Sequence, residues 1–125
     1  MPGKRILVID DEDDIREVAQ VSLELVGSYE VITASNGRDG VDRARSERPD
    51  AILLDVMMPD MDGPTTLAEL RVDPATHDIP VVFLTAKTQT MERARLAELG
   101  AAGVLTKPFD PLKLAGEVAA ALKWS

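Results

Sequence analysis

The sequence predicts an α/β domain, built on a five-stranded parallel sheet that carries helices on both of its faces. Five short runs rich in Val, Ile and Leu alternate with five longer segments of helical periodicity along the 125 residues. The short runs lack a polar face, as the strands of a sheet covered on both sides do. Strict alternation of strand and helix favours parallel crossover connections.

Each predicted strand is short, and several end at a polar residue. The five strands are expected at Ile6–Ile9, Tyr29–Thr33, Ala51–Leu54, Pro80–Leu84 and Val104–Leu105. Asp55 follows the third strand, Thr85 the fourth, and Lys107 and Pro108 the fifth. Because the carboxyl ends of parallel strands share one edge of the sheet, these polar side chains are expected at that edge.

The helices are predicted from residues that repeat at helical spacing and from the signals that begin or end a helix. The expected inward positions are Ile15, Val18, Ala19, Ser22, Leu23 and Val26 in the first helix, Val41 and Ala44 in the second, Met91, Ala94 and Ala97 in the fourth, and Leu114, Ala115, Val118, Ala119 and Leu122 in the fifth. The expected boundary signals are Gly27, the turn Asn36-Gly37, Pro49-Asp50, Pro64, Gly100, and Asp110 as the cap of the fifth helix with Pro111 just inside it.

Composition narrows the class of protein. Apolar residues make up 45% of the chain and aromatic residues 3%, so aliphatic side chains must form the core of a single domain over residues 1–125. Cysteine is absent, which excludes disulfides and thiolate metal sites and is typical of the cytoplasm. The net charge of -8 argues against a nucleic-acid surface, and no apolar run is long enough for a membrane span.

Five consecutive acids, residues 10–14, follow the first strand directly. Two like charges about 4 Å apart repel by about 1 kcal/mol in water and about 4 kcal/mol near a protein surface. If the first and third strands are neighbours, Asp10, Asp11 and Asp55 converge, and a hard cation such as Mg²⁺ would offset their repulsion. Glu12 and the two acids after it are expected to be solvated residues of the first helical turn, where acids favour the helix dipole.

Four motifs in this order and spacing resemble the receiver domain of two-component response regulators, of the single-domain type found among chemotaxis regulators. They are VIDDED at residues 8–13, LLDVMMPDMDG at 53–63, FLTAK at 83–87 and VLTKPF at 104–109. Each motif alone is weak, but the four together are specific and span nearly the whole chain. The resemblance implies a flavodoxin-like (βα)5 fold with strand order 2-1-3-4-5.

The resemblance also implies how the acids act. Asp55 would accept a phosphoryl group from a sensor histidine kinase or a histidine phosphotransfer protein. Asp11 and Asp55 would ligate Mg²⁺ directly, together with the backbone carbonyl of Met57, while Asp10 would hold the ion mostly through water. No organic cofactor is implied, and the chain would be a self-phosphorylating and self-dephosphorylating switch and not a turnover enzyme.

Further roles follow from the same resemblance. Lys107 would pair with phosphoryl oxygens, aimed by a cis peptide bond to Pro108, and Thr85 would move inward to hydrogen-bond the new phosphate. The signal would leave through the fourth helix, fifth strand and fifth helix, toward a downstream protein or a second copy of the chain. Val104 stands where the family usually has a switching aromatic, so either this face shifts by backbone and loop motion or the switch is muted.

Two alternative functions stay open. Without an aromatic at Val104, the chain could be a receiver-like module that binds a partner constitutively. An aspartyl-phosphate phosphatase is a weaker alternative, because such enzymes place a second aspartate two residues after the nucleophile and this chain has Met57 there.

One further motif is a decoy. Asp60, Asp62, Gly63 and Glu69 match four positions of an EF-hand calcium loop, but Met58 stands where the first ligand is required. An apolar strand, and not a helix, leads into this loop. Calcium binding is therefore not expected here.

Overall fold

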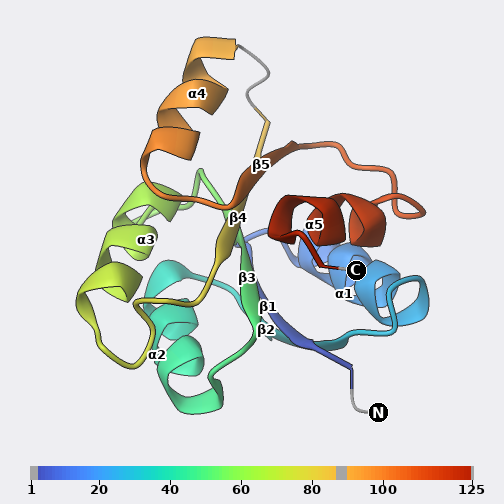
Figure 1. Cartoon of the computed structure of the whole chain (residues 1–125), viewed down its shortest axis with the longest axis horizontal. Coiled ribbons are helices and arrows are strands. Elements are labelled where there is room, and N and C mark those ends of the chain that lie inside the picture. The colour runs from blue at the N-terminus through green and yellow to red at the C-terminus, as the bar shows by residue number, and fades with distance from the viewer. Residues whose placement is uncertain (1–2, 87–89, 125) are drawn as a thin grey trace.

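The computed structural model describes residues 3–86 and 90–124, within which five strands and five helices alternate. The elements are β1 (Arg5–Ile9), α1 (Asp13–Leu25), β2 (Glu30–Ala34), α2 (Gly37–Glu47), β3 (Ala51–Asp55), α3 (Gly63–Val72), β4 (Val81–Thr85), α4 (Thr90–Glu98), β5 (Gly103–Thr106) and α5 (Leu114–Leu122). All paired strands are parallel, and their order is β2-β1-β3-β4-β5 (Figure 1). The predicted fold class and strand order are confirmed.

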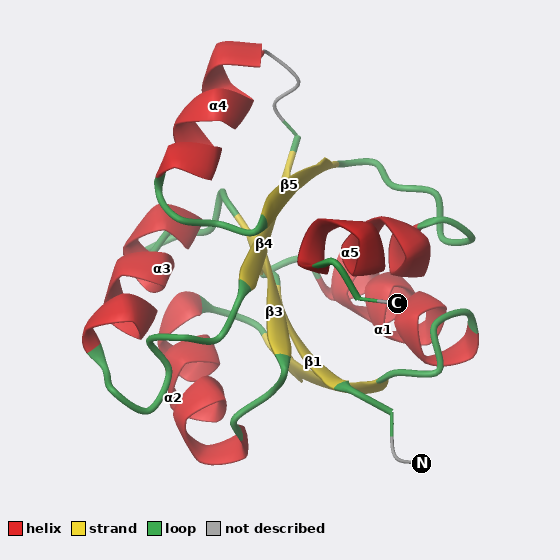
Figure 2. Ribbon diagram, in the orientation of Figure 1, coloured by secondary structure: helices red, strands yellow, loops and turns green. Residues whose placement is uncertain are grey.

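The helices form one layer on each side of the sheet. Figure 2 shows α1 and α5 on one side, with α2, α3 and α4 on the other. Alternate residues of β1 supply the two cores: Leu7 and Ile9 face the α2–α3–α4 side, and Ile6 and Val8 face the α1–α5 side. Both cores are mostly aliphatic, as the composition predicted. Burial of each large side chain contributes about 1.5–3 kcal/mol to folding.

The sheet register places the candidate site. The strand order reverses between β1 and β3. Ile9 of β1 is paired with Leu54 of β3, so the next residues, Asp10 and Asp55, lie side by side at the carboxyl edge of the sheet. β4 is next to β3, with Leu84 paired with Asp55. In open α/β sheets ligands bind outside this edge, at the point where the strand order reverses.

The buried face of α1 is narrower than predicted. Ala19, Ser22 and Leu23 are buried, but Val18 and Val26 are 41% and 48% exposed. The predicted stripe was wrong at these two positions, because α1 contacts the sheet and α5 along one flank and leaves the other flank to solvent.

The inward residue of α4 also differs from the prediction. Met91 is 75% exposed, and Ala94 and Ala97 are exposed as well, whereas Leu96 is buried. The alanines gave a weak apolar signal on more than one face of this helix, so periodicity pointed to the wrong face.

The boundary signals succeed at two helices and fail at a third. The Asn36 side chain accepts a hydrogen bond from the Asp39 backbone N–H at 2.8 Å and caps α2, and Pro64 lies in the first turn of α3. α5, by contrast, begins at Leu114, because Asp110 organises a separate turn before it. Its carboxylate accepts from the Leu112 N–H at 2.9 Å.

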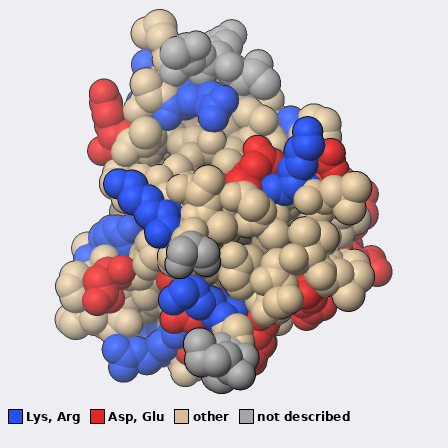
Figure 3. Space-filling view, turned by 45° about the vertical axis from the view of Figure 1, so that its right-hand side comes forward, with Lys and Arg blue, Asp and Glu red and all other residues tan. Residues whose placement is uncertain are grey.

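Charge is unevenly spread over the surface. Figure 3 shows an area of uncharged side chains on the side brought forward, with acids at its edge, while several basic side chains lie toward the opposite side of the view. Within the described residues, none of the helices combines the length and the apolar character needed to cross a bilayer.

Candidate functional site

Four carboxylates meet at the carboxyl edge of β1 and β3. One oxygen from each of Asp10, Asp11, Glu12 and Asp55, hereafter the acid cluster, lies within 4.8 Å of the others. Asp10 and Asp55 are 1% and 4% exposed, because both directly terminate buried strands. The structure thus brings together the three aspartates selected from the sequence and adds Glu12 to them.

Buried oxygens in this cluster lack hydrogen-bond partners. Among the described residues, Asp11 Oδ1 and Asp55 Oδ2 are buried and accept no hydrogen bond. Asp10 Oδ2 is also buried and accepts no hydrogen bond, although it forms an ion pair with Lys107. Burying carboxylate oxygens without partners is costly, and several hard oxygens on one crevice suit a divalent cation such as Mg²⁺. The residues present therefore fit such an ion.

Met57 lies in the loop two residues after Asp55, with a side chain that is 64% exposed. Its thioether is a soft ligand and does not suit a hard cation. The prediction for this residue concerned its backbone carbonyl alone, and that role stays a prediction.

The Lys107 ammonium is the cation at the centre of the cluster. Its Nζ lies 3.0 Å from Asp10 Oδ2, 3.2 Å from Asp55 Oδ1 and 3.2 Å from Glu12 Oε1. The peptide bond from Lys107 to Pro108 is cis, as predicted. β5 and the chain just after it carry this lysine over the ends of β1 and β3, across 95 residues of sequence from Glu12.

Burial dominates the electrostatics of the site. It raises the pKa of Asp55 to about 6, the Asp10 charge raises it further, and Lys107 lowers it by less than the raising effects together. Burial likewise raises the pKa of Asp10. Burial alone would lower the pKa of Lys107, but its contacts with Asp10, Asp55 and Glu12 outweigh that effect and raise it. The lysine therefore stays charged, and one positive charge serves several carboxylates.

Thr85 ends β4, which lies between β3, the strand that ends at Asp55, and β5, the strand that precedes Lys107. It is 1% exposed, and its backbone carbonyl accepts a hydrogen bond from the Lys107 N–H at 2.8 Å. The structure thus places all three predicted catalytic residues at one edge of the sheet. Lys87, which the sequence places near this site, lies outside the described residues.

Val104, the predicted switch position, lies on β5 and packs against the core on the α2–α3–α4 side. Its backbone carbonyl accepts a hydrogen bond from Arg93 Nη2 of α4 at 2.9 Å. This contact ties α4 to β5 at the position where an aromatic was expected.

Glu12 is the site residue that sequence reasoning missed. The sequence predicts a solvated helical turn at this position, yet the Glu12 carboxylate contacts Lys107. The available signal was its place directly after Asp11, at the strand end where the other acids gather. Asp13, by contrast, pairs with Arg16 of its own helix.

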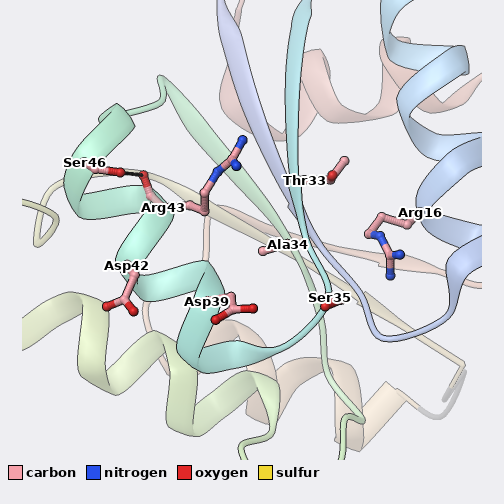
Figure 4. Close-up of a pocket in the computed structure, with 8 residues that line it drawn as sticks. All are labelled: Arg16, Thr33, Ala34, Ser35, Asp39, Asp42, Arg43 and Ser46. Carbon is pink, nitrogen blue, oxygen red and sulfur yellow. Dashed lines mark hydrogen bonds between the residues drawn. The ribbon is translucent and has the colours of Figure 1, made fainter.

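The acids of the EF-hand match lie apart from this chemistry. Asp62 Oδ1 accepts from the Thr65 N–H at 2.8 Å and so caps α3, which accounts for this acid without calcium. A hollow of about 380 Å³ lies near the end of β2, and Figure 4 shows the residues that line it. Arg16 connects this hollow to the acid cluster, because its Nη1 donates to the Asp10 carbonyl at 2.8 Å. Its lining residues are Arg16, Thr33, Ala34, Ser35, Asp39, Asp42, Arg43 and Ser46.

Comparison with known proteins identifies the family. The model of the response regulator receiver domain matches residues 6–119. The chain belongs to the response regulator receiver family. It is 42% identical over 123 residues to the alkaline phosphatase synthesis transcriptional regulatory protein PhoP of Bacillus subtilis, covering 98% of this chain and 50% of that protein. It is 40% identical to the phosphate regulon regulatory protein PhoB of Pseudomonas aeruginosa, covering 98% and 53%. This receiver chain therefore spans about half the length of the curated relatives it matches.

Solved receiver structures agree with this membership. The chemotaxis response regulator CheY4 of Vibrio cholerae superposes with a TM-score of 0.87 at 31% identity, covering 95% of this chain and 98% of that one. The N-terminal domain of a response regulator receiver protein from Methanoculleus marisnigri gives a TM-score of 0.78 at 38% identity, covering 98% of each chain. The receiver fold and its place in two-component signalling are thus established.

Proposed function

We propose that this receiver, with residues 1–125 as one domain, is a cytoplasmic phosphorelay switch that accepts a phosphoryl group on Asp55 in a Mg²⁺-dependent reaction. The donor would be the phosphohistidine of a sensor kinase or of a phosphotransfer protein. The observation that carries this proposal is the pairing of a buried Asp55 with Lys107, 3.2 Å away, inside a cluster of carboxylates with unpartnered oxygens.

Phosphoryl transfer needs an aligned nucleophile and neutralised oxygens. A carboxylate oxygen of Asp55 would form a bond to phosphorus while the bond from phosphorus to the donor nitrogen breaks, and the electron pair would stay on the imidazole. Hydrolysis would later return the carboxylate and release inorganic phosphate. The switch thus resets itself without turning over a free metabolite.

The neighbouring residues support this chemistry. Lys107 would pair with the phosphoryl oxygens, and the Thr85 hydroxyl would hydrogen-bond one of them. A cation held by Asp10, Asp11, Asp55 and the Met57 carbonyl would, when bound, supply positive charge to the transferring group. The Asp55 carboxyl must be ionised to attack phosphorus. With a pKa of about 6, this carboxyl is ionised in most molecules at neutral pH.

Phosphorylation of Asp55 would then alter the face formed by α4, β5 and α5 and so change its affinity for a downstream protein or a second copy. Arg93, which joins α4 to the Val104 carbonyl, supports coupling between these elements. The relatives that extend beyond the receiver are named as transcriptional regulators, which makes control of an output step the natural role.

The test uses acetyl phosphate as a small donor. The parent, Asp55→Asn and Asp60→Asn would each be incubated with and without Mg²⁺, and the intact masses recorded. Asp60 is an exposed acid of the same loop, so its variant is a matched control. The parent and Asp60→Asn should gain one phosphoryl group only with Mg²⁺, and Asp55→Asn should gain none. Equal labelling of Asp55→Asn would refute the proposal.

The valine at position 104 favours one second candidate, a module that binds its partner regardless of phosphorylation. Beryllofluoride, which mimics the acyl phosphate, separates the two functions. Partner affinity that is the same with and without beryllofluoride supports the constitutive module, while a change supports the switch.

A further inference from the structure

The Lys107 ammonium has three N–H donors, and three carboxylates surround it. Asp10, Glu12 and Asp55 each place an oxygen 3.0–3.2 Å from Nζ. The lysine side chain is 11% exposed, so bulk water has little access to it. Glu12 meets the geometry of a hydrogen bond to Nζ, while Asp10 and Asp55 contact it as ion pairs. A phosphoryl oxygen that contacts the ammonium must therefore compete with these three carboxylates.

The three acceptors are not equivalent. The Asp10 and Asp55 side chains are 1% and 4% exposed, and each lies at the end of a buried strand. The Glu12 side chain is 55% exposed and belongs to the loop between β1 and α1. A carboxylate that leaves the lysine remains buried in the first two cases but becomes hydrated in the third. Release of Glu12 thus carries the smallest desolvation cost.

The backbone around Glu12 allows its side chain to move independently. Its N–H donates to Asp10 Oδ1 at 2.9 Å, which fixes the loop without using the Glu12 carboxylate. Glu12 precedes the first residue of α1, where its side chain makes no capping hydrogen bond. Nothing described in α1 depends on the Glu12 carboxylate.

We propose that Glu12 is a positioning residue that holds Lys107 in the unphosphorylated protein and yields its place to a phosphoryl oxygen. This inference rests on the proposed function, since it concerns the same reaction. Glu12 then acts as a brake on phosphorylation. Its contact with Lys107 must break before the Lys107 ammonium can pair with the incoming phosphoryl group. Loss of the contact, at constant net charge, should speed phosphoryl transfer to Asp55.

Glu12→Asp tests this directly. The aspartate side chain is one methylene shorter, so it keeps the charge but withdraws from Lys107. Aspartate is also favoured at a helix N-cap, so the variant should fold. Asp14→Asn is the control: it removes a charge from the same exposed turn, and the Asp14 carboxylate contacts only a backbone N–H within the described residues.

The rate of acetyl phosphate labelling of Asp55 at saturating Mg²⁺ should rise about two- to fivefold in Glu12→Asp, the range expected for a partly exposed ion pair. Asp14→Asn should react at close to the parent rate. A Glu12→Asp rate equal to or below that of the parent would overturn the inference, as would an equal acceleration in Asp14→Asn. If the parent itself is not labelled, the proposed function fails instead.

An equilibrium readout separates release of the lysine from any effect on the metal. Beryllofluoride affinity in the presence of Mg²⁺ should rise in Glu12→Asp by a factor similar to the rate. Mg²⁺ affinity alone should stay at the parent value, because the net charge of the cluster is unchanged. A rate increase that came with tighter Mg²⁺ binding and unchanged beryllofluoride affinity would contradict the brake.

Discussion

At the scale of single residues, the Asp55 carboxyl sets the energetics of the acid cluster. Its pKa in the folded chain, about 6, lies above the ordinary value of 3.8. Between these values the folded state binds more protons than the unfolded state, so this group lowers stability as pH rises through about 4 to 6. At higher pH the ionised group remains a net cost to the metal-free fold.

Asp55→Asn should therefore stabilise the metal-free protein in a pH-dependent manner. The gain over the parent should be small near pH 4 and approach about 3 kcal/mol near pH 7, at 1.36 kcal/mol per pKa unit. Urea unfolding in EDTA at several pH values measures it, with Asp60→Asn as the control, and Mg²⁺ should narrow the gap by stabilising the parent. A gain that did not change with pH would show that burial of this charge is not its cause.

Lys107 provides a complementary prediction. Lys107→Ala leaves buried Asp10 and Asp55 without their counter-charge, and removal of one partner of a buried ion pair costs about 3–5 kcal/mol. The metal-free variant should lose stability of this order in urea unfolding. Lys113→Ala, at an exposed lysine, should lose little. Similar losses in both variants would mean that Lys107 does not stabilise the cluster.

At the scale of elements, the hydrogen bond that caps α2 is local and does not involve the acid cluster. The hydrogen bond from the Asp39 N–H to Asn36 Oδ1 should make Asn36→Ala less stable by about 1 kcal/mol. Ser35→Ala, at the exposed preceding residue, is the control. Phosphorylation rates should match the parent in both. A slower rate in Asn36→Ala would reveal coupling between this cap and the acid cluster.

Local patterns predicted the strands better than the helix faces. The runs that became β1, β3 and β4 are apolar throughout, so no choice of face was needed. A helix requires that choice. In α4, alanines on more than one face pointed to Met91 as the inward residue, whereas Leu96 is the buried one. The start of α5 was also misplaced, because a capping aspartate at position 110 signals a turn as readily as a helix.

At the scale of the whole molecule, phosphorylation should reach the α4–β5–α5 face although Val104 replaces the aromatic. The Val104 carbonyl accepts a hydrogen bond from Arg93, so a movement of β5 should also displace α4. Formation of the acyl phosphate should change amide chemical shifts over residues 86–122, measured in ¹H–¹⁵N spectra with beryllofluoride. Shifts confined to the ends of β1 and β3 would show that the signal stops at the site.

The sequence predicted those residues of the site whose place is set by the topology of the sheet. Strand ends identified Asp10, Asp11, Asp55, Thr85 and Lys107, because parallel strands place their carboxyl ends on one edge. Glu12 also follows a strand end, but its contact with Lys107 was not predictable, because the direction of its side chain depends on loop backbone conformation and on a lysine 95 residues away. Helical periodicity carries no information about such a contact.

We propose that Asp55 itself receives the phosphoryl group and that the acid cluster binds the required metal. Peptide mapping after acetyl phosphate treatment, with Mg²⁺ or with EDTA, tests it most directly. We expect a single phosphoryl group, on the peptide that contains Asp55, and only in Mg²⁺. Label on another residue, or equal label in EDTA, would contradict it.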